Sequence, residues 1–141
     1  MNNKAPFLVT LFFAAACLGC SSGHVGSSGK VVFSDDGSPV TFGTVMFATP
    51  TFQAKGDINK DGTFKMGSYG AADGLPTGSY KVAIIGVIEE TDDGRFYSLL
   101  DPKWTGPATT EFTVDVEKTT KNLVIKVDRN PETLEQFKSK K

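Results

Sequence analysis

Residues 74–88 read GLPTGSYKVAIIGVI, a turn signal that runs directly into the longest β-like segment of the chain. Pro76 fixes φ and Gly78 permits positive φ, so a tight turn can precede an extended segment rich in β-branched residues. A period of two places Tyr80 and Ile84 on the same face of that segment. Beyond Ile84 both faces are apolar, which is typical of a central strand covered on both sides. The sequence therefore predicts a buried strand around which the other elements are arranged.

Short strands separated by Gly, Pro and Asp turns are predicted along the remainder of the domain. Apolar and polar residues alternate strictly over 111–117 and again over 123–127. The segment 95–100 is open to two interpretations, a short edge strand or part of a long loop. The other expected strands cover residues 30–33, 43–49, 52–58 and 63–66. About seven strands with turns roughly every 8 to 12 residues predict an all-β, antiparallel β-sandwich, with a closed barrel as the alternative.

The N-terminus has the layout of a secretory signal peptide, which we expect to span residues 1–19. Lys4 supplies a positive charge ahead of an apolar run over residues 5–18. About 14 apolar residues are too few for a bilayer-spanning helix, which needs roughly 20. The sequence therefore predicts export rather than a permanent membrane span.

The apolar run ends in the sequence Cys17-Leu18-Gly19-Cys20, which resembles the lipobox of bacterial lipoproteins. The resemblance implies that the thiol of Cys20 receives diacylglycerol, that cleavage makes Cys20 the new N-terminus, and that membrane lipid is its partner. Cys17 departs from the family pattern, which usually has Leu at that position. Ser21 follows Cys20, and by resemblance to Gram-negative sorting this favours the outer membrane over the inner. The alternative is ordinary cleavage that leaves Cys20 as a free thiol.

Both cysteines lie in this N-terminal segment, so the exported domain has no possible internal disulfide. Residues 20–29 are rich in Ser and Gly, and we expect a flexible tether that reaches roughly 15–20 Å. His24, the single histidine of the chain, lies in this tether. The expected β-sandwich covers residues 30–128. A charged tail follows at 129–141, in which Pro131 can open a brief helix.

Composition limits the partners of the domain. The formal charge is −1, and removal of Lys4 with the signal peptide makes it −2. No basic stripe stands out, so nucleic acid is not an expected partner. About 110 residues from Lys30 onward are enough for one core without disulfides. The sequence does not predict an oligomeric state.

Four short motifs follow one another along the expected sandwich. They are Gly29-Lys30-Val31, Gly37-Ser38-Pro39-Val40 leading into Gly43-Thr44-Val45, Asp61-Gly62-Thr63-Phe64, and Pro76-Thr77-Gly78-Ser79-Tyr80-Lys81-Val82. In this order they resemble the carboxypeptidase regulatory-like domain over residues 29–127, and the segment 102–114 is similar to small planctomycete-type envelope lipoproteins built on that domain. The resemblance implies a transthyretin-like (prealbumin-like) Greek-key sandwich that acts as an accessory or binding module of the cell envelope.

Catalysis is not expected, although the family name suggests it. A zinc carboxypeptidase site needs imidazole and carboxylate ligands, and His24 is the only imidazole. The same shortage leaves no Ser-His-Asp triad, and the domain has no cysteine nucleophile. Hydrolysis by carboxylates alone stays open through pairs such as Glu89 and Glu90, but adjacent strand residues point to opposite faces. We therefore expect a non-enzymatic protein without a cofactor.

One short segment resembles a calcium loop. Residues 57–62 read DINKDG, the first half of the D-x-[DN]-x-[DN]-G pattern, which makes Asp57, Asn59 and Asp61 candidate ligands. The twelfth position is Ser68 instead of a bidentate Glu. A β-turn held by Asx hydrogen bonds is the competing interpretation.

Trp104 is the candidate ligand-binding residue, because it lies in a proline-bounded loop with Phe96 and Tyr97 upstream. Aromatic side chains on such loops are common carbohydrate or protein contacts. Alternatively, the indole folds back to cap the open end of the core. The leading functional hypothesis is a lipid-anchored envelope module that binds a protein or a glycan. The alternatives are a structural spacer that pairs through an exposed sheet edge, and a calcium-dependent adhesion module.

Overall fold

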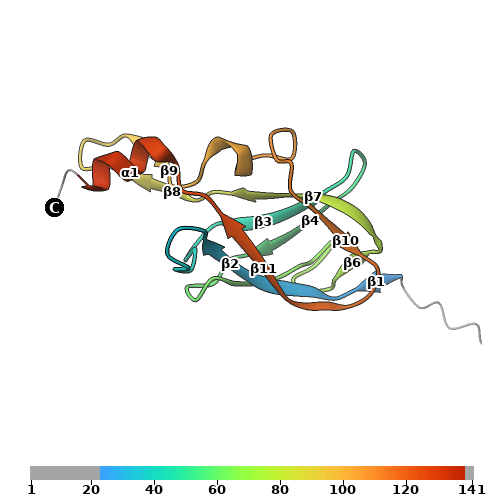
Figure 1. Ribbon diagram of the computed structural model, residues 1–141. Coiled ribbons are helices and arrows are strands. Elements are labelled where there is room, and N and C mark those ends of the chain that lie inside the picture. Colours follow the sequence, from blue (N-terminus) through green and yellow to red (C-terminus); the bar gives the residue numbers. More distant parts are fainter. Residues whose placement is uncertain (1–22, 139–141) are drawn as a thin grey trace, which may run out of the picture.

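A computed structural model describes residues 23–138, which form an all-β sandwich (Figure 1). The expected signal peptide and Cys20 lie outside these residues. One layer is an antiparallel sheet of order β10-β7-β3-β4, and the other has order β11-β2-β5. The strands are β2 (Ser27–Phe33), β3 (Thr44–Ala48), β4 (Gln53–Asp57), β5 (Thr63–Lys65), β7 (Gly78–Ile85), β10 (Thr113–Val116) and β11 (Thr120–Val127). The predicted sandwich of about seven main strands is confirmed.

The strand that begins at Gly78 is central, as its sequence predicts. β7 pairs with β3 on one side and with β10 on the other. Val82 is buried between the sheets, while Ala83 is buried on the outer face of the same strand. The apolar run does not continue as one strand to Ile88, because Gly86 adopts a φ of 74° and turns the chain. Beyond this turn, β8 (Ile88–Glu90) pairs with β9 (Phe96–Ser98). The segment 95–100, for which the sequence allows a strand or a loop, therefore contains a hairpin strand.

The core lies between the two sheets and is organised around aromatic rings that meet in one stacked and one edge-to-face pair. Phe47 on β3 lies with its ring centroid 6.1 Å from Tyr80 on β7 and 6.5 Å from Phe64 on β5. The Tyr80 hydroxyl donates a hydrogen bond to the Pro76 carbonyl at 2.7 Å, so this buried polar group is satisfied. The aromatic pairs therefore hold the β3 and β7 layer against the layer that contains β5.

β2 lies in the middle of the second sheet, antiparallel to β5 and parallel to β11. The parallel pair joins the first long strand of the chain to the last. The predicted sandwich was antiparallel, and the apolar alternation of 123–127 gives no information on strand direction. The structure therefore retains the predicted two layers and adds one parallel pairing.

The predicted tether at residues 20–29 is too long. β1 (His24–Val25) pairs with β6 (Leu75–Pro76), and β2 already begins at Ser27, which is buried. The small residues allow close packing here, because a Cβ on Gly29 would lie 2.0 Å from the Leu123 carbonyl oxygen. The Ser27 carbonyl also accepts a hydrogen bond from the Met66 amide at 2.8 Å. The Ser- and Gly-rich composition thus reflects strand packing at this point.

The C-terminal end of the domain is fastened to the sandwich. Arg129 forms ion pairs with Asp35 at 2.9 Å and with Asp36 at 3.1 Å, and its guanidinium lies 3.5 Å from the centre of the Phe33 ring. The brief helix expected from Pro131 is present as α1 (Pro131–Lys138). It lies near β8 and β9, at the end of the molecule opposite to β1 (Figure 1). The segment 129–138 is therefore more than a charged tail.

The contact at Gly29 yields a prediction on stability. In Gly29→Ala the added methyl group would meet the Leu123 backbone, so we expect the free energy of unfolding to fall by about 2 kcal/mol or more. Gly26→Ala is the matched control, because a Cβ there would lie 3.6 Å from the Thr119 side chain, an ordinary contact. The control should stay within about 0.5 kcal/mol of the parent. Urea unfolding measures both, and equal stabilities would contradict the assignment.

Candidate binding surfaces

The β8–β9 hairpin exposes two large apolar side chains on one face. Its register pairs Ile88 with Ser98 and Glu90 with Phe96, and cross-strand partners lie on the same side of a sheet. Ile88 and Phe96 therefore share a face, with exposed fractions of 50% and 72%. Phe96 lies upstream of Trp104 in the aromatic group that the sequence singles out. Ile88 was missed because it was counted as part of the long strand.

The opposite face of the hairpin is fixed by polar contacts. The Tyr97 hydroxyl donates a hydrogen bond to the Glu89 carboxylate at 2.9 Å. Burial and the nearby Glu89 carboxylate raise the pKa of the Tyr97 phenol above its usual value. In the turn, the Thr91 amide donates to the Arg95 carbonyl at 2.7 Å, and its hydroxyl donates to Asp93. The hairpin thus presents the Ile88 and Phe96 face on a hydrogen-bonded frame.

The charge of the hairpin is predominantly acidic. Its four carboxylates belong to Glu89, Glu90, Asp92 and Asp93. Arg95 is its one cation, and its Nε lies 2.9 Å from the Asp93 carboxylate. The exposed apolar pair is therefore bordered by unbalanced negative charge.

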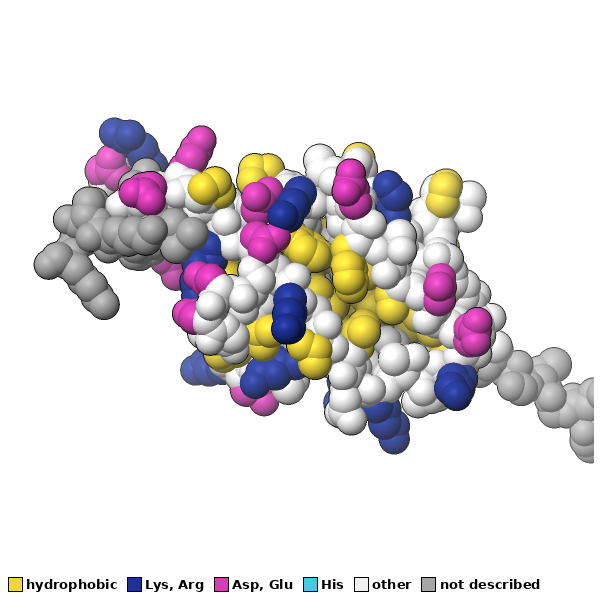
Figure 2. Space-filling view, viewed as in Figure 1, with side chains coloured by type: hydrophobic (Ala, Val, Ile, Leu, Met, Phe, Trp, Pro, Cys, Tyr) yellow, Lys and Arg dark blue, Asp and Glu magenta, His cyan; other side chains and the backbone are white. Residues whose placement is uncertain are grey.

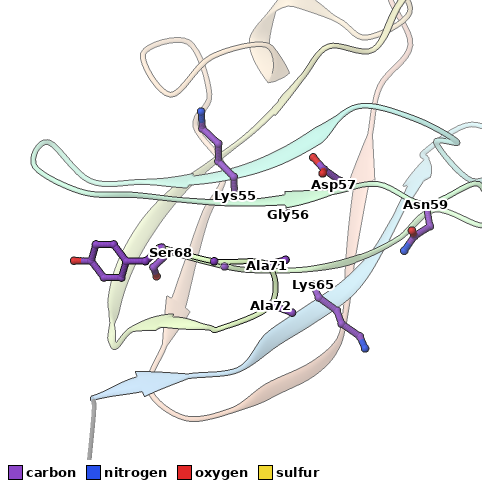
Figure 3. A pocket seen from close by; sticks show the side chains of 11 residues that line it. Lys55, Gly56, Asp57, Asn59, Lys65, Ser68, Ala71 and Ala72 are labelled. Carbon is purple, nitrogen blue, oxygen red and sulfur yellow. The ribbon is translucent and has the colours of Figure 1, made fainter.

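A polar groove lies beside the edge strand β4 and is closed on one side by the loop 67–72 (Figure 3). It has a volume of about 610 Å³. Lys55 and Lys65 border it and extend away from each other, while Asp57 and Asn59 lie toward one end (Figure 3). The groove offers hydrogen-bond donors and acceptors of mixed sign to a ligand.

The loop that closes this groove is held by one carboxylate. Asp73 accepts hydrogen bonds from the amides of Ser68 at 2.6 Å, Tyr69 at 3.1 Å and Gly70 at 2.9 Å. These bonds, that from Ser68 foremost, lower the pKa of Asp73. The Tyr69 side chain is 86% exposed, and its ring centroid lies 5.8 Å from that of His24. The exposure of Tyr69 is not predicted from the sequence, because nothing in its small and polar neighbours marks it as exposed.

The calcium candidates direct their polar atoms to other protein groups. The Asp57 carboxylate accepts a hydrogen bond from the Thr44 hydroxyl at 3.1 Å. The Asn59 amide donates to the Thr63 carbonyl at 3.0 Å, and Asp61 accepts from the Thr63 amide at 3.0 Å and from its hydroxyl at 2.6 Å. The bonds from Thr63, its hydroxyl first, lower the pKa of Asp61. Within residues 23–138, no group of three or more His, Cys, Asp or Glu is placed to hold a metal ion. The geometry is that of an Asx-stabilised turn.

Calcium is accordingly expected to leave the protein unchanged. Millimolar calcium should not shift its melting temperature, because the oxygens of the 57–62 turn already accept internal hydrogen bonds. Asp61→Ala should lower the melting temperature by the same amount with and without calcium. A calcium-dependent rise that disappears in Asp61→Ala would instead identify a metal site.

Trp104 is a core side chain, with 8% of its surface exposed. It ends η1 (Pro102–Trp104), and its ring centroid lies 5.6 Å from that of Phe112. The indole N–H donates to the Asp128 carboxylate at 3.4 Å. Hydrogen bonds to that carboxylate, first from Lys103 and then from Ser34, lower the pKa of Asp128 to about 2. Trp104 also lines a hollow of about 510 Å³, but little of its surface is exposed there to a ligand.

The burial of Trp104 predicts its fluorescence. Trp104 is the single tryptophan of the chain, so its emission reports this site alone. We expect blue-shifted emission that acrylamide quenches weakly in the folded protein, and red-shifted, readily quenched emission in urea. Equal quenching in the two states would show that the indole is exposed in solution.

Comparison of the chain with models of known protein families, with curated proteins and with solved structures gives no match. Among the helices that the structure describes, none is both long and apolar enough to cross a bilayer.

Proposed function

We propose that the chain is a non-catalytic, lipid-anchored protein of the cell envelope whose β8–β9 hairpin binds a protein partner. The proposed anchor is the lipidated Cys20, with the outer membrane as the favoured location. The signal-like N-terminus and the lipobox resemblance support this placement. The two-sheet architecture is compatible with the proposed carboxypeptidase regulatory-like family, whose implied role is an accessory or binding module.

The observation that carries the proposal is the shared exposure of Phe96 and Ile88 on one hairpin face. Complete burial of one such side chain stabilises a complex by about 1.5–3 kcal/mol relative to exposure. Aromatic side chains at the centre of interfaces contribute disproportionately to binding. A partner that covers this face would thus gain from two adjacent apolar groups.

The frame beneath these side chains lowers the cost of binding. The Tyr97–Glu89 hydrogen bond and the bonds between Thr91 and Arg95 restrict the conformations of the hairpin. A preorganised surface loses less conformational entropy in the complex. The hairpin therefore loses less conformational entropy on binding than a flexible loop with the same residues would.

Charge indicates the kind of partner. The acidic border of the hairpin favours a protein surface that combines a basic rim with an apolar centre. Lys and Arg side chains are interspersed with Asp and Glu over the face in Figure 2, which does not favour nucleic acid. The apolar hairpin favours a protein partner over a glycan, for which the polar groove beside β4 is the better surface.

Site-specific photo-crosslinking in cells tests the proposal. A benzoylphenylalanine in place of Phe96 keeps an aromatic ring at the proposed contact. We expect it to give a discrete adduct of higher mass that mass spectrometry identifies as one partner protein. Adding Ile88→Ala should weaken that adduct, because it removes the second apolar group.

Val124 is the matched control position, since it is also apolar and is 55% exposed, but lies on β11. It also tests the second candidate function, a spacer that pairs through a sheet edge, because β11 is the outer strand of its sheet within the described residues. An adduct from position 124 and none from position 96 would overturn the hairpin proposal in favour of edge pairing. Absence of an adduct from both would overturn both.

A further inference from the structure

The part of the chain that the structure describes begins very close to the proposed lipid anchor. Three residues separate Cys20 from His24, the first residue of β1. The four residue steps from Cys20 to His24 span at most about 14 Å when fully extended. We propose that the β1–β6 end of the domain lies on the membrane surface, with the Tyr69 ring at the lipid–water interface. This inference rests on the proposed lipidation of Cys20, but not on the hairpin partner.

Tyr69 lies beside His24, close to the N-terminal end of the described residues. Its ring is 86% exposed and approaches the ring of His24, with 5.8 Å between centroids. A tyrosine ring has an apolar body and a polar hydroxyl, which is why tyrosine is enriched where membranes meet water. A bilayer held four residues from His24 is thus the nearest apolar phase available to this ring.

The loop around Tyr69 suits a close approach to lipid. The next residues, Gly70, Ala71 and Ala72, are exposed, small and uncharged. The Asp73 carboxylate fixes the start of the loop by accepting three backbone hydrogen bonds. The Tyr69 ring therefore projects from a hydrogen-bonded loop, and the small side chains beside it do not block its approach to lipid.

Charged groups of both signs lie at this end of the domain, with no cluster of one sign among them. The turn between β10 and β11 lies beside Gly26, whose carbonyl accepts a hydrogen bond from the Thr120 amide at 2.8 Å. That turn carries Glu117 and Lys118, of opposite sign, and the Asp73 carboxylate is engaged by its own loop. Docking should thus depend on the anchor and the ring, and should change little with salt.

The short connection restricts the orientation of the whole domain. A domain of this length has a radius of gyration of about 13 Å, comparable to the full reach of the connection. The β1–β6 end is therefore kept close to the bilayer. The hairpin and α1 lie at the opposite end (Figure 1), so they face away from the membrane.

Fluorescence quenching by lipids tests this orientation in the full chain. The fluorophore NBD is attached at Ala71→Cys near Tyr69, or at Asp92→Cys in the hairpin turn. The lipidated proteins are reconstituted in phosphatidylcholine vesicles that contain a lipid spin-labelled near its headgroup. We expect at least threefold stronger quenching at position 71 than at position 92, unchanged between 50 and 500 mM salt.

Variants of Tyr69 separate its ring from the effect of the tether. In the Ala71→Cys protein, Tyr69→Ser should reduce the quenching at least twofold, while Tyr69→Trp should retain it. Unchanged melting temperatures in detergent would show that neither variant alters the fold. Equal quenching at positions 71 and 92 would overturn the orientation, and quenching independent of residue 69 would overturn its interfacial role.

The mass of the purified protein reports the anchor separately. A mature chain that begins at an acylated Cys20 supports the premise, and an unacylated chain overturns it together with the orientation. Crosslinking from position 96 does not depend on Tyr69. Failure of membrane docking is thus distinguishable from failure of the proposed partner contact.

Discussion

The close approach of β2 to β11 at Gly29 is the constraint on which the sandwich depends. The Leu123 carbonyl occupies the space that any side chain at position 29 would need. This contact brings Val31 and Ile125, both fully buried, into one layer above the four-stranded sheet. Gly29 and Leu123 lie 94 residues apart in the sequence, so their pairing closes the fold over a long stretch of chain. Arg129 then fastens the end of β11 to Asp35 and Asp36.

The same pairing separates the two ends of the molecule. β2 begins beside β1 and runs for seven residues, about 23 Å at 3.3 Å per residue, toward the Arg129 contacts. Because β11 runs parallel to β2, it ends at the same far end, and α1, which follows β11, lies there too. The hairpin and the N-terminal end are thus kept apart by the length of the paired strands. This separation suits the proposed function, in which one end is held at the membrane and the other binds a partner.

The sequence could predict the two layers but not how their edges meet. Residues 111–117 alternate, and the residues after Tyr80 are apolar, because the side chains of these strands that face the core are buried. Both strands can therefore be predicted from the sequence pattern. Ser27 and Gly29 were misjudged because composition does not distinguish a glycine that packs against a backbone from one in a flexible linker. Ile88 was misjudged because its exposure depends on the turn at Gly86. Strand direction between β2 and β11 depends on contacts that no local pattern records.

Whether a candidate side chain is buried or exposed also depends on contacts that the sequence pattern does not show. Trp104 is buried because an indole whose N–H reaches Asp128 can be covered without an unsatisfied donor. Phe96 belongs to a two-stranded hairpin, which has two faces and only one domain against which to pack. Glu89 and Tyr97 are half-buried, so their face is turned toward the protein, and the face with Ile88 and Phe96 remains in water. Two strands alone are marginally stable and bury little of their own surface. The protein partner that we propose would cover the apolar face that the sandwich leaves open.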